Sequence, residues 1–176
     1  MTDGATTTFQ QPEPNRIHTI SLFVHNRPGV LSRVALVFAR RGYNIESLVV
    51  SPGAQAGFSR MTIACSGDSA ILDQIIKQLD KLVDVVRAVD HTGGANYETE
   101  IALIKLRCEA DERTEILQIA EHFNARVVDY AAASIMLRLY GSSEKLNAMI
   151  RLLDDYDMDE LVRSGKILMA RGIETT

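Results

Sequence analysis

The sequence has few cysteines, no excess of positive charge and no long apolar run, and each shortage excludes a class of protein. Cys65 and Cys108 lie far apart, each within strand-like apolar sequence, which fits neither metal-ligand spacing nor a disulfide framework. We therefore expect two free, buried thiols. The four histidines are scattered without a second ligand at metal spacing, so we expect no metal site. With a formal net charge of -4, the chain has no basic stripe for a phosphate backbone, and we expect no nucleic-acid partner.

The N-terminal segment also lacks a targeting signal. Residues 1–16 are polar, without the apolar core and basic flank of a signal peptide, and we predict a disordered tail there. Because no apolar run is long enough to cross a bilayer, we expect no membrane partner and a reducing, cytoplasmic setting. The 176 residues, 46% of them hydrophobic, suffice for one ordinary domain or two small ones.

Apolar residues with the periods of strands and helices occur in the same order in both halves of the chain. In the first half the patterns predict a strand from residue 17, a helix ended by Gly42, strands at 44–50 and 58–65, a helix at 69–79 and a strand at 83–90. In the second half they predict strands at 100–108, 125–131 and 134–140 and two helices with matching apolar spacing. A linker at 91–96 contains two adjacent glycines and separates the halves.

The agreement of element order and helix spacing favours two copies of one unit over two unrelated small domains. Leu31 and Phe38 align with Ile116 and Phe123 at the same helical spacing. We predict an α+β protein with two tandem ferredoxin-like βαββαβ sandwiches, at residues 17–92 and 97–172. Each sheet then has one face without helices, and we expect association between units or between chains to cover it.

The sequence lacks the motifs that would indicate an enzyme. It contains no nucleophile elbow, dinucleotide-binding glycine motif, phosphate loop or zinc-binding H-E-x-x-H. A small enzyme that binds phosphate at Gly29 would need a paired catalytic group, and for the nearest candidates, His25 and Arg27, a core or surface role is favoured. RNA binding is disfavoured because the aromatic residues of the predicted strands lack a basic field: Phe23, Phe58, Tyr130 and Tyr140.

The two copies differ where the first helix of each begins. The second copy has capping residues there, such as Asp111 and Thr114, whereas the first has Pro28 and Gly29 followed by two apolar residues. Glycine lets another group approach the backbone closely, and free amides at the positive end of a helix attract a carboxylate. Since a plain turn accounts for Pro-Gly before a helix equally well, the residues alone leave the turn and the ligand site both open.

Three segments resemble a known family, the small regulatory subunit of acetolactate synthase (acetohydroxyacid synthase). They are NRPGVLSRVALVFARRGYNIESLVVSP at 26–52, FSRMTI at 58–63 and QLDKLVDVVRAVD at 78–90. The resemblance covers about residues 17–172. It implies an ACT domain, an amino-acid-sensing ferredoxin-like module, at 17–92, and a C-terminal domain of related topology.

The resemblance also implies a regulator without catalytic residues. Its expected partners are the large catalytic subunit, a second copy bound through the ACT domains, and valine as feedback inhibitor. Thiamine diphosphate, Mg²⁺ and FAD would belong to the catalytic subunit, with no cofactor in this chain. The implied valine ligands are Asn26, Gly29, Val30 and Leu31 of one chain with Asn44 and Ile45 of the partner. An ACT-domain sensor of a different enzyme is the alternative.

Overall fold

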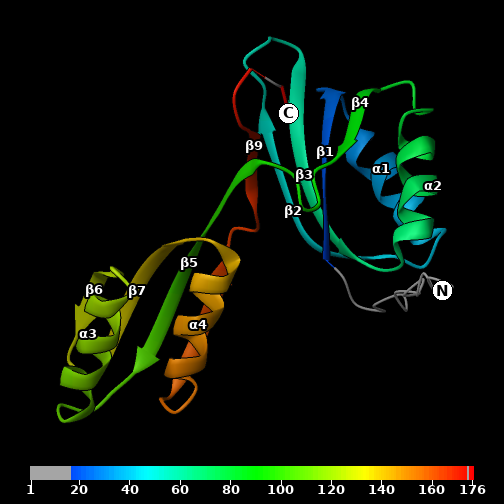
Figure 1. Cartoon of the computed structure of the whole chain (residues 1–176). Helices are drawn as coiled ribbons and strands as arrows, with labels where there is room; N and C mark the ends of the chain where they lie inside the picture. Colours follow the sequence, from blue (N-terminus) through cyan, green and yellow to red (C-terminus); the bar gives the residue numbers. More distant parts are fainter. Residues whose placement is uncertain (1–16, 174) are drawn as a thin grey trace, which may run out of the picture.

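The computed structural model describes residues 17–173, 175 and 176, so the tail predicted at residues 1–16 lies outside the described residues. These residues form two βαββαβ domains (Figure 1). The first consists of β1 (Ile17–His25), α1 (Val30–Ala39), β2 (Asn44–Pro52), β3 (Phe58–Ser66), α2 (Ser69–Leu79) and β4 (Val85–Asp90). Its strands are antiparallel in the order β2-β3-β1-β4, and both helices lie on one face of the sheet.

The second domain repeats this arrangement and adds one strand. It consists of β5 (Asn96–Arg107), α3 (Glu112–His122), β6 (Arg126–Ala131), β7 (Ser134–Gly141), α4 (Ser143–Leu153), β8 (Met158–Arg163) and β9 (Ile167–Ala170). The sheet order is β6-β7-β5-β8, equivalent to that of the first domain. The short β9 pairs with Asn96–Thr99, the first part of β5. The predicted α+β fold with two ferredoxin-like sandwiches is therefore confirmed.

Each domain has its own core between the sheet and the helices. In β1 the alternate residues Ile20, Leu22 and Val24 are fully buried against the helices, as the period of two predicts. In β5 the fully or almost fully buried alternate residues are Ala102, Ile104 and Leu106. Since alternate strand residues point to opposite faces, their neighbours lie on the faces that carry no helix.

The buried stripe of α1 includes the predicted Phe38 but begins at another residue. Leu31, predicted to face the core, is 43% exposed, whereas Val30 is buried and begins the helix. In α3 the buried residues are Ile116 and Ala120, which correspond to Val34 and Phe38 when the helix starts Val30 and Glu112 are aligned. The two helices begin at equivalent positions, because four residues separate each of them from the preceding strand, so Gly29 takes the place of Asp111.

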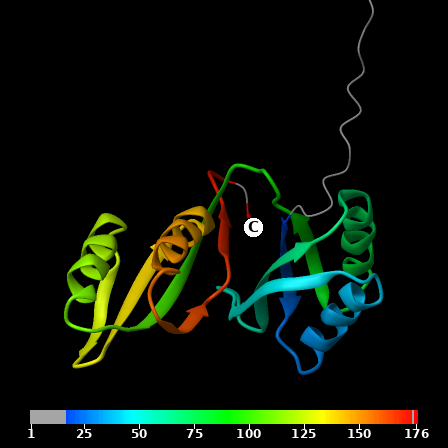
Figure 2. The ribbon, with the colours of Figure 1, turned by 90° about the horizontal axis from the view of Figure 1, so that it is seen from below.

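The helix-free face of the first sheet is covered in part by the same chain. Ser21, Thr62 and His91 are buried on this side, and Ser21 Oγ lies 2.7 Å from His91 Nε2. Figure 2 shows β9 between the two domains. The connection from β8 to β9 contacts β2, because a Cβ built on Gly165 would lie 3.0 Å from Cβ of Ser47. The two-stranded ribbon formed by β9 and the first part of β5 therefore joins the two domains.

Candidate functional site

The site predicted at the start of α1 has an uncapped helix terminus. Gly29 directly precedes the helix with φ of 81°, and no side chain caps the first turn, which also contains no acidic residue. The equivalent helix α3 begins differently, because the Asp111 carboxylate accepts a hydrogen bond from the Glu112 amide at 3.1 Å. The contrast that the two sequences predict at these helix starts is therefore present in the structure.

The first amides of α1 remain available to a ligand. The Val30 amide is 3.4 Å from the Arg27 carbonyl oxygen, a weak contact. No residue that the structure describes accepts a hydrogen bond from the amide of Leu31 or Ser32. Gly29, Leu31 and Ser32 are exposed, so a small anion can reach these donors from solvent.

Two contacts hold the residues before the helix in place. The His25 amide donates to the Asp84 carbonyl oxygen and the Asn26 amide to the Gly57 carbonyl oxygen, each at 2.8 Å. Together they tie the end of β1 to the loop before β4 and to the β2–β3 connection. Backbone hydrogen bonds from two neighbouring segments therefore hold the N-terminal end of α1 in place.

A charged side chain that sequence reasoning missed lies over Gly29. Arg33 Nη2 is 2.5 Å from Asp84 Oδ2, and a Cβ on Gly29 would lie 3.1 Å from Arg33 Nη1. Arg33 follows Gly29 by four residues, a spacing that places both on one helix face and could have drawn attention to it. Asp84 is 51 residues away in sequence, and no local pattern indicated this pairing.

The structure separates the six predicted ligand residues into two groups. Asn26 and Leu31 lie exposed beside Gly29, but the Val30 side chain is 3% exposed within the core. Val30 can therefore offer only its backbone to a ligand at this terminus.

Asn44 and Ile45 lie at the other end of the same sheet. Asn44 pairs with Ser66, which pairs with Ile17, whereas Asn26 directly follows His25. Eight residue steps along β1 separate those two ends by about 27 Å. Within one chain, therefore, Asn44 and Ile45 cannot contact a ligand at Gly29.

The side chains around Asn44 form a small hydrogen-bonded group. Asn44 Nδ2 donates to Glu46 Oε1 at 2.9 Å, and Ser66 Oγ donates to the same oxygen at 2.6 Å. These two bonds, that of Ser66 foremost, lower the pKa of the Glu46 carboxyl. The ionised Glu46 thus fixes the orientation of the Asn44 amide at the start of β2.

The buried thiols are the remaining candidates for chemistry. Cys65 and Cys108 are both free and buried, as expected. Burial, with smaller effects of Asp90 and Glu46, raises the pKa of the Cys65 thiol to about 11, so it is not an activated nucleophile. Among the described residues, no group of three or more His, Cys, Asp or Glu side chains could hold a metal ion. No helix in the described part of the chain is long and apolar enough to cross a membrane.

Comparison with known proteins relates this chain to one family. The profile of the small subunit of acetolactate synthase matches residues 99–172, and that of the AHAS small subunit-like ACT domain matches residues 20–87. The probable acetolactate synthase small subunit of Archaeoglobus fulgidus is 41% identical over 155 residues, which cover 88% of this chain and 97% of that protein. The acetolactate synthase small subunit of Mycolicibacterium smegmatis is also 41% identical, over 88% of this chain and 91% of that one.

A solved structure gives the same result. The crystal structure of the acetolactate synthase small subunit from Thermotoga maritima superposes with a TM-score of 0.80 at 37% identity, covering 89% of this chain and 98% of that one. Nothing in these comparisons supports a sensor of a different enzyme. The matches span both domains, in the order in which the structure contains them. This chain therefore belongs to the family of acetolactate synthase small subunits, the regulatory subunits of that enzyme.

Proposed function

We propose that this chain binds valine at the start of α1, and that valine controls its effect on the large catalytic subunit of acetolactate synthase. The observation that carries the proposal is the uncapped helix terminus at Gly29, beside which lie exposed amides and the Arg33 guanidinium. The equivalent terminus in the second domain is closed by Asp111. The first domain is therefore the sensing domain, and the chain has no catalytic role of its own.

The groups at this terminus suit the two charged ends of an amino acid. The amides of Leu31 and Ser32 and the positive end of the helix face the carboxylate, and Gly29 leaves space for its approach. In this proposal, the side-chain oxygen of the exposed Asn26 and nearby backbone oxygens accept hydrogen bonds from the ammonium group. The exposed Leu31 side chain contributes to an apolar pocket for the isopropyl group.

A second copy completes the site. β2 lies at the edge of the first sheet, and its outer side has no strand partner among the described residues. Antiparallel pairing of two β2 edges about a two-fold axis brings the partner's strand start to the Pro52 end of this strand. The N-terminus of α1 lies at that end of the sheet. Pro52 pairs with Ser59, and Ser59 pairs with Val24, which lies just before the connection to α1. Asn44 and Ile45 then act on the partner's ligand, in a homodimer joined through the ACT domains.

The regulatory effect is exerted on a catalytic subunit that carries the cofactors. Thiamine diphosphate, Mg²⁺ and FAD belong to that subunit, and the complex functions in the cytoplasm. Docking without valine favours an ordered active site, whereas valine favours an arrangement of the dimer that fails to do so. Valine can shift the equilibrium between the two arrangements of the dimer only if it binds one of them more tightly. The coupling free energy between two such sites is typically about 1–3 kcal/mol.

Reconstitution tests the proposal. The purified chain is mixed with the catalytic subunit, and acetolactate formation is measured with and without valine. We expect the chain to raise the rate and valine to reverse the increase by roughly 5- to 150-fold, as the coupling energy implies. Leucine and isoleucine serve as controls for selectivity. A rate that does not change on mixing would contradict activation of the catalytic subunit by this chain. A rate that rises on mixing but does not respond to valine would contradict only the valine-sensing part of the proposal.

A further inference from the structure

Arg33 places a positive charge beside the uncapped start of α1. Its Nη1 would lie 3.1 Å from a Cβ built on Gly29, so the guanidinium lies against the side of Gly29 on which a side chain would stand. Helical side chains lean toward the N-terminus of their helix, which brings residue 33 back over residue 29. The guanidinium therefore borders the approach to the free amides of Leu31 and Ser32.

Asp84 engages only one of the nitrogens of this guanidinium. Arg33 Nη2 lies 2.5 Å from Asp84 Oδ2, and the Asp84 side chain is only 13% exposed. Nη1 and Nε have no hydrogen-bond acceptor among the described residues. Because a guanidinium is planar and rigid, a bond that anchors Nη2 also restricts the direction of Nη1. In the described part of the chain, an unused donor is thus held beside Gly29.

The equivalent helix of the second domain carries the opposite charge at this position. When the helix starts Val30 and Glu112 are aligned, Arg33 corresponds to Glu115. The first turn of α3 contains two acidic residues, and Glu115 accepts a hydrogen bond from the Tyr156 hydroxyl at 3.0 Å. A carboxylate ligand is therefore repelled at the start of α3 and attracted at the start of α1.

We propose that Arg33 is the residue by which this site selects a ligand with a free carboxylate. Asp84 holds one edge of the guanidinium, and the other edge donates to the carboxylate of the amino acid. The inference rests on the proposed function, since it adds a residue to the valine site. The carboxylate then lies between neutral amide donors and a full positive charge. Charge-assisted hydrogen bonds are roughly twice as strong as neutral ones, so Arg33 contributes the larger share of the selectivity.

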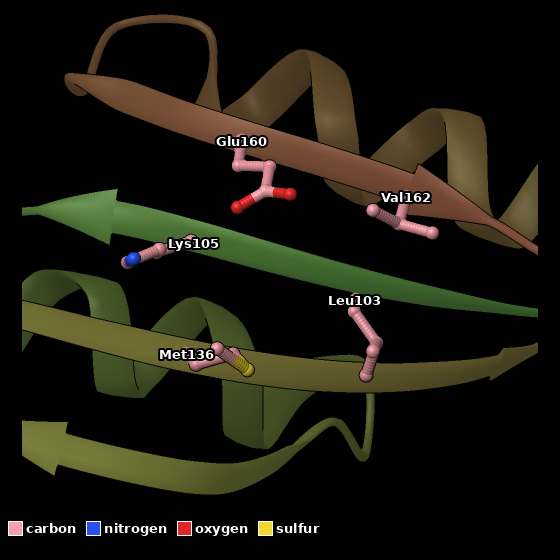
Figure 3. Close-up of a pocket in the computed structure, with 5 residues that line it drawn as sticks. All are labelled: Leu103, Lys105, Met136, Glu160 and Val162. Atoms are coloured by element: carbon pink, nitrogen blue, oxygen red, sulfur yellow. The ribbon is translucent and has the colours of Figure 1, made fainter.

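A rival place for an amino acid is a small hollow on the helix-free face of the second sheet (Figure 3). The hollow measures about 70 Å³ and is lined by Leu103, Lys105, Met136, Glu160 and Val162. Lys105 lies opposite Glu160 in the β5–β8 register, and the lining residues belong to strands, so no helix amide is at hand. The two places make opposite predictions, because a carboxylate in the hollow would depend on Lys105 and not on Arg33.

A double-mutant cycle between protein and ligand tests the contact. Dissociation constants of L-valine and of L-valinamide, in which an amide replaces the carboxylate, are measured by titration calorimetry on the full-length chain, with competition for the weaker ligand. The unmodified chain should prefer valine, and Arg33→Met should reduce this preference about tenfold, as expected for one charge-assisted hydrogen bond. Any loss of stability from the broken pair with Asp84 affects both ligands and cancels in the ratio.

Two matched controls remove a positive charge elsewhere. Arg40, the exposed C-cap residue of the same helix, is replaced in Arg40→Met, which tests for an effect of net charge at a distance. Lys105→Met removes the cation of the hollow. Both variants should keep the preference of the unmodified chain. A preference that Lys105→Met lowers and Arg33→Met leaves intact would assign the carboxylate to the hollow and overturn the role of Arg33.

Arg33→Lys keeps the test valid if Arg33→Met disturbs folding, because a lysine ammonium can still pair with Asp84. It lacks the planar fork that faces two carboxylates at fixed positions, so most of the preference for valine should again be lost. An unmodified chain that binds no valine would contradict the proposed function itself. Valine binding in which both Arg33 variants retain the full preference would refute the role of Arg33 and leave the proposed function intact.

Discussion

Replacing Gly29 by alanine tests whether the backbone conformation at the start of α1 is required. Gly29 has φ of 81°, where an L-residue costs about 1–2 kcal/mol. A less flexible unfolded chain offsets about 0.4–1 kcal/mol of this loss, which leaves a net cost near 1 kcal/mol. Gly42, just after the same helix, has φ of 68° and nothing within 4 Å of an added Cβ. Gly42→Ala therefore carries the conformational cost alone and serves as the matched control.

At Gly29 the added methyl group has a second effect. It would lie 3.1 Å from Arg33 Nη1, so the guanidinium must move by a few tenths of an ångström while Asp84 holds it. Because 46% of the Arg33 side chain is exposed, losing this ion pair costs at most about 1 kcal/mol. We expect Gly29→Ala to lose about 1–2 kcal/mol and Gly42→Ala about 1 kcal/mol. In a chain of this size, each 1 kcal/mol lowers Tm by about 2–4 °C.

Calorimetric melting with and without valine, at one protein concentration, separates stability from sensing. A ligand that binds only the folded state raises Tm, and we expect valine to do so for the unmodified chain and for Gly42→Ala. Gly29→Ala should show a smaller shift, because its methyl group occupies the approach to the amides. An equal valine shift in all three proteins would refute a ligand site at Gly29. A Tm unchanged by either substitution would refute the conformational argument.

Two further predictions concern buried groups. Arg163→Met should lower the free energy of unfolding, measured with urea, by about 2 kcal/mol, because Glu100, only 3% exposed, loses both of its charge-assisted hydrogen bonds. Glu100→Gln should lower it less, because no buried charge is left without a partner. Equal losses would contradict this argument, because they would show that leaving the Glu100 charge unpaired has no cost of its own. Cys65 has a pKa raised to about 11 by burial, so the unfolded chain ionises first and stability should fall as pH rises above about 9. A disulfide reagent at pH 8 should react with this thiol only on unfolding, and rapid reaction of the folded chain would contradict its burial.

The parts of the fold that could be predicted from sequence are those with one buried face. The alternation of Ile20, Leu22 and Val24 predicts β1 because one side of the strand faces helices and the other does not. The start of the buried stripe of α1 was predicted one residue too late, because Val30 and Leu31 are both apolar and both lie at helical spacing from the buried Val34. Only the left-handed conformation of Gly29 decides where the helix begins.

The unpredicted elements depend on contacts between distant segments. β9 spans only Ile167–Ala170 and pairs with Asn96–Thr99, and neither segment has a pattern that identifies its partner. The same holds for the ion pair of Arg33 with Asp84 at the candidate site. Gly29 could be singled out as a candidate because the second copy offers an internal comparison, whereas the assignment of Asn44 to the partner came from the family resemblance, and both remain predictions.

The β8–β9 connection of the second domain packs closely on β2 of the first. Gly165 has φ of 79°, and an added Cβ would lie 3.0 Å from Cβ of Ser47 and 3.2 Å from a methyl group of Val49. Ser47 and Val49 belong to β2, the strand that begins with Asn44 and Ile45, the residues that we propose act on the partner's ligand. Packing this close transmits displacement because there is no free space to absorb it. Under the proposed function, a displacement of β2 on ligand binding would therefore press on the β8–β9 connection, and through β9 on β5, which belongs to the sheet of the second domain.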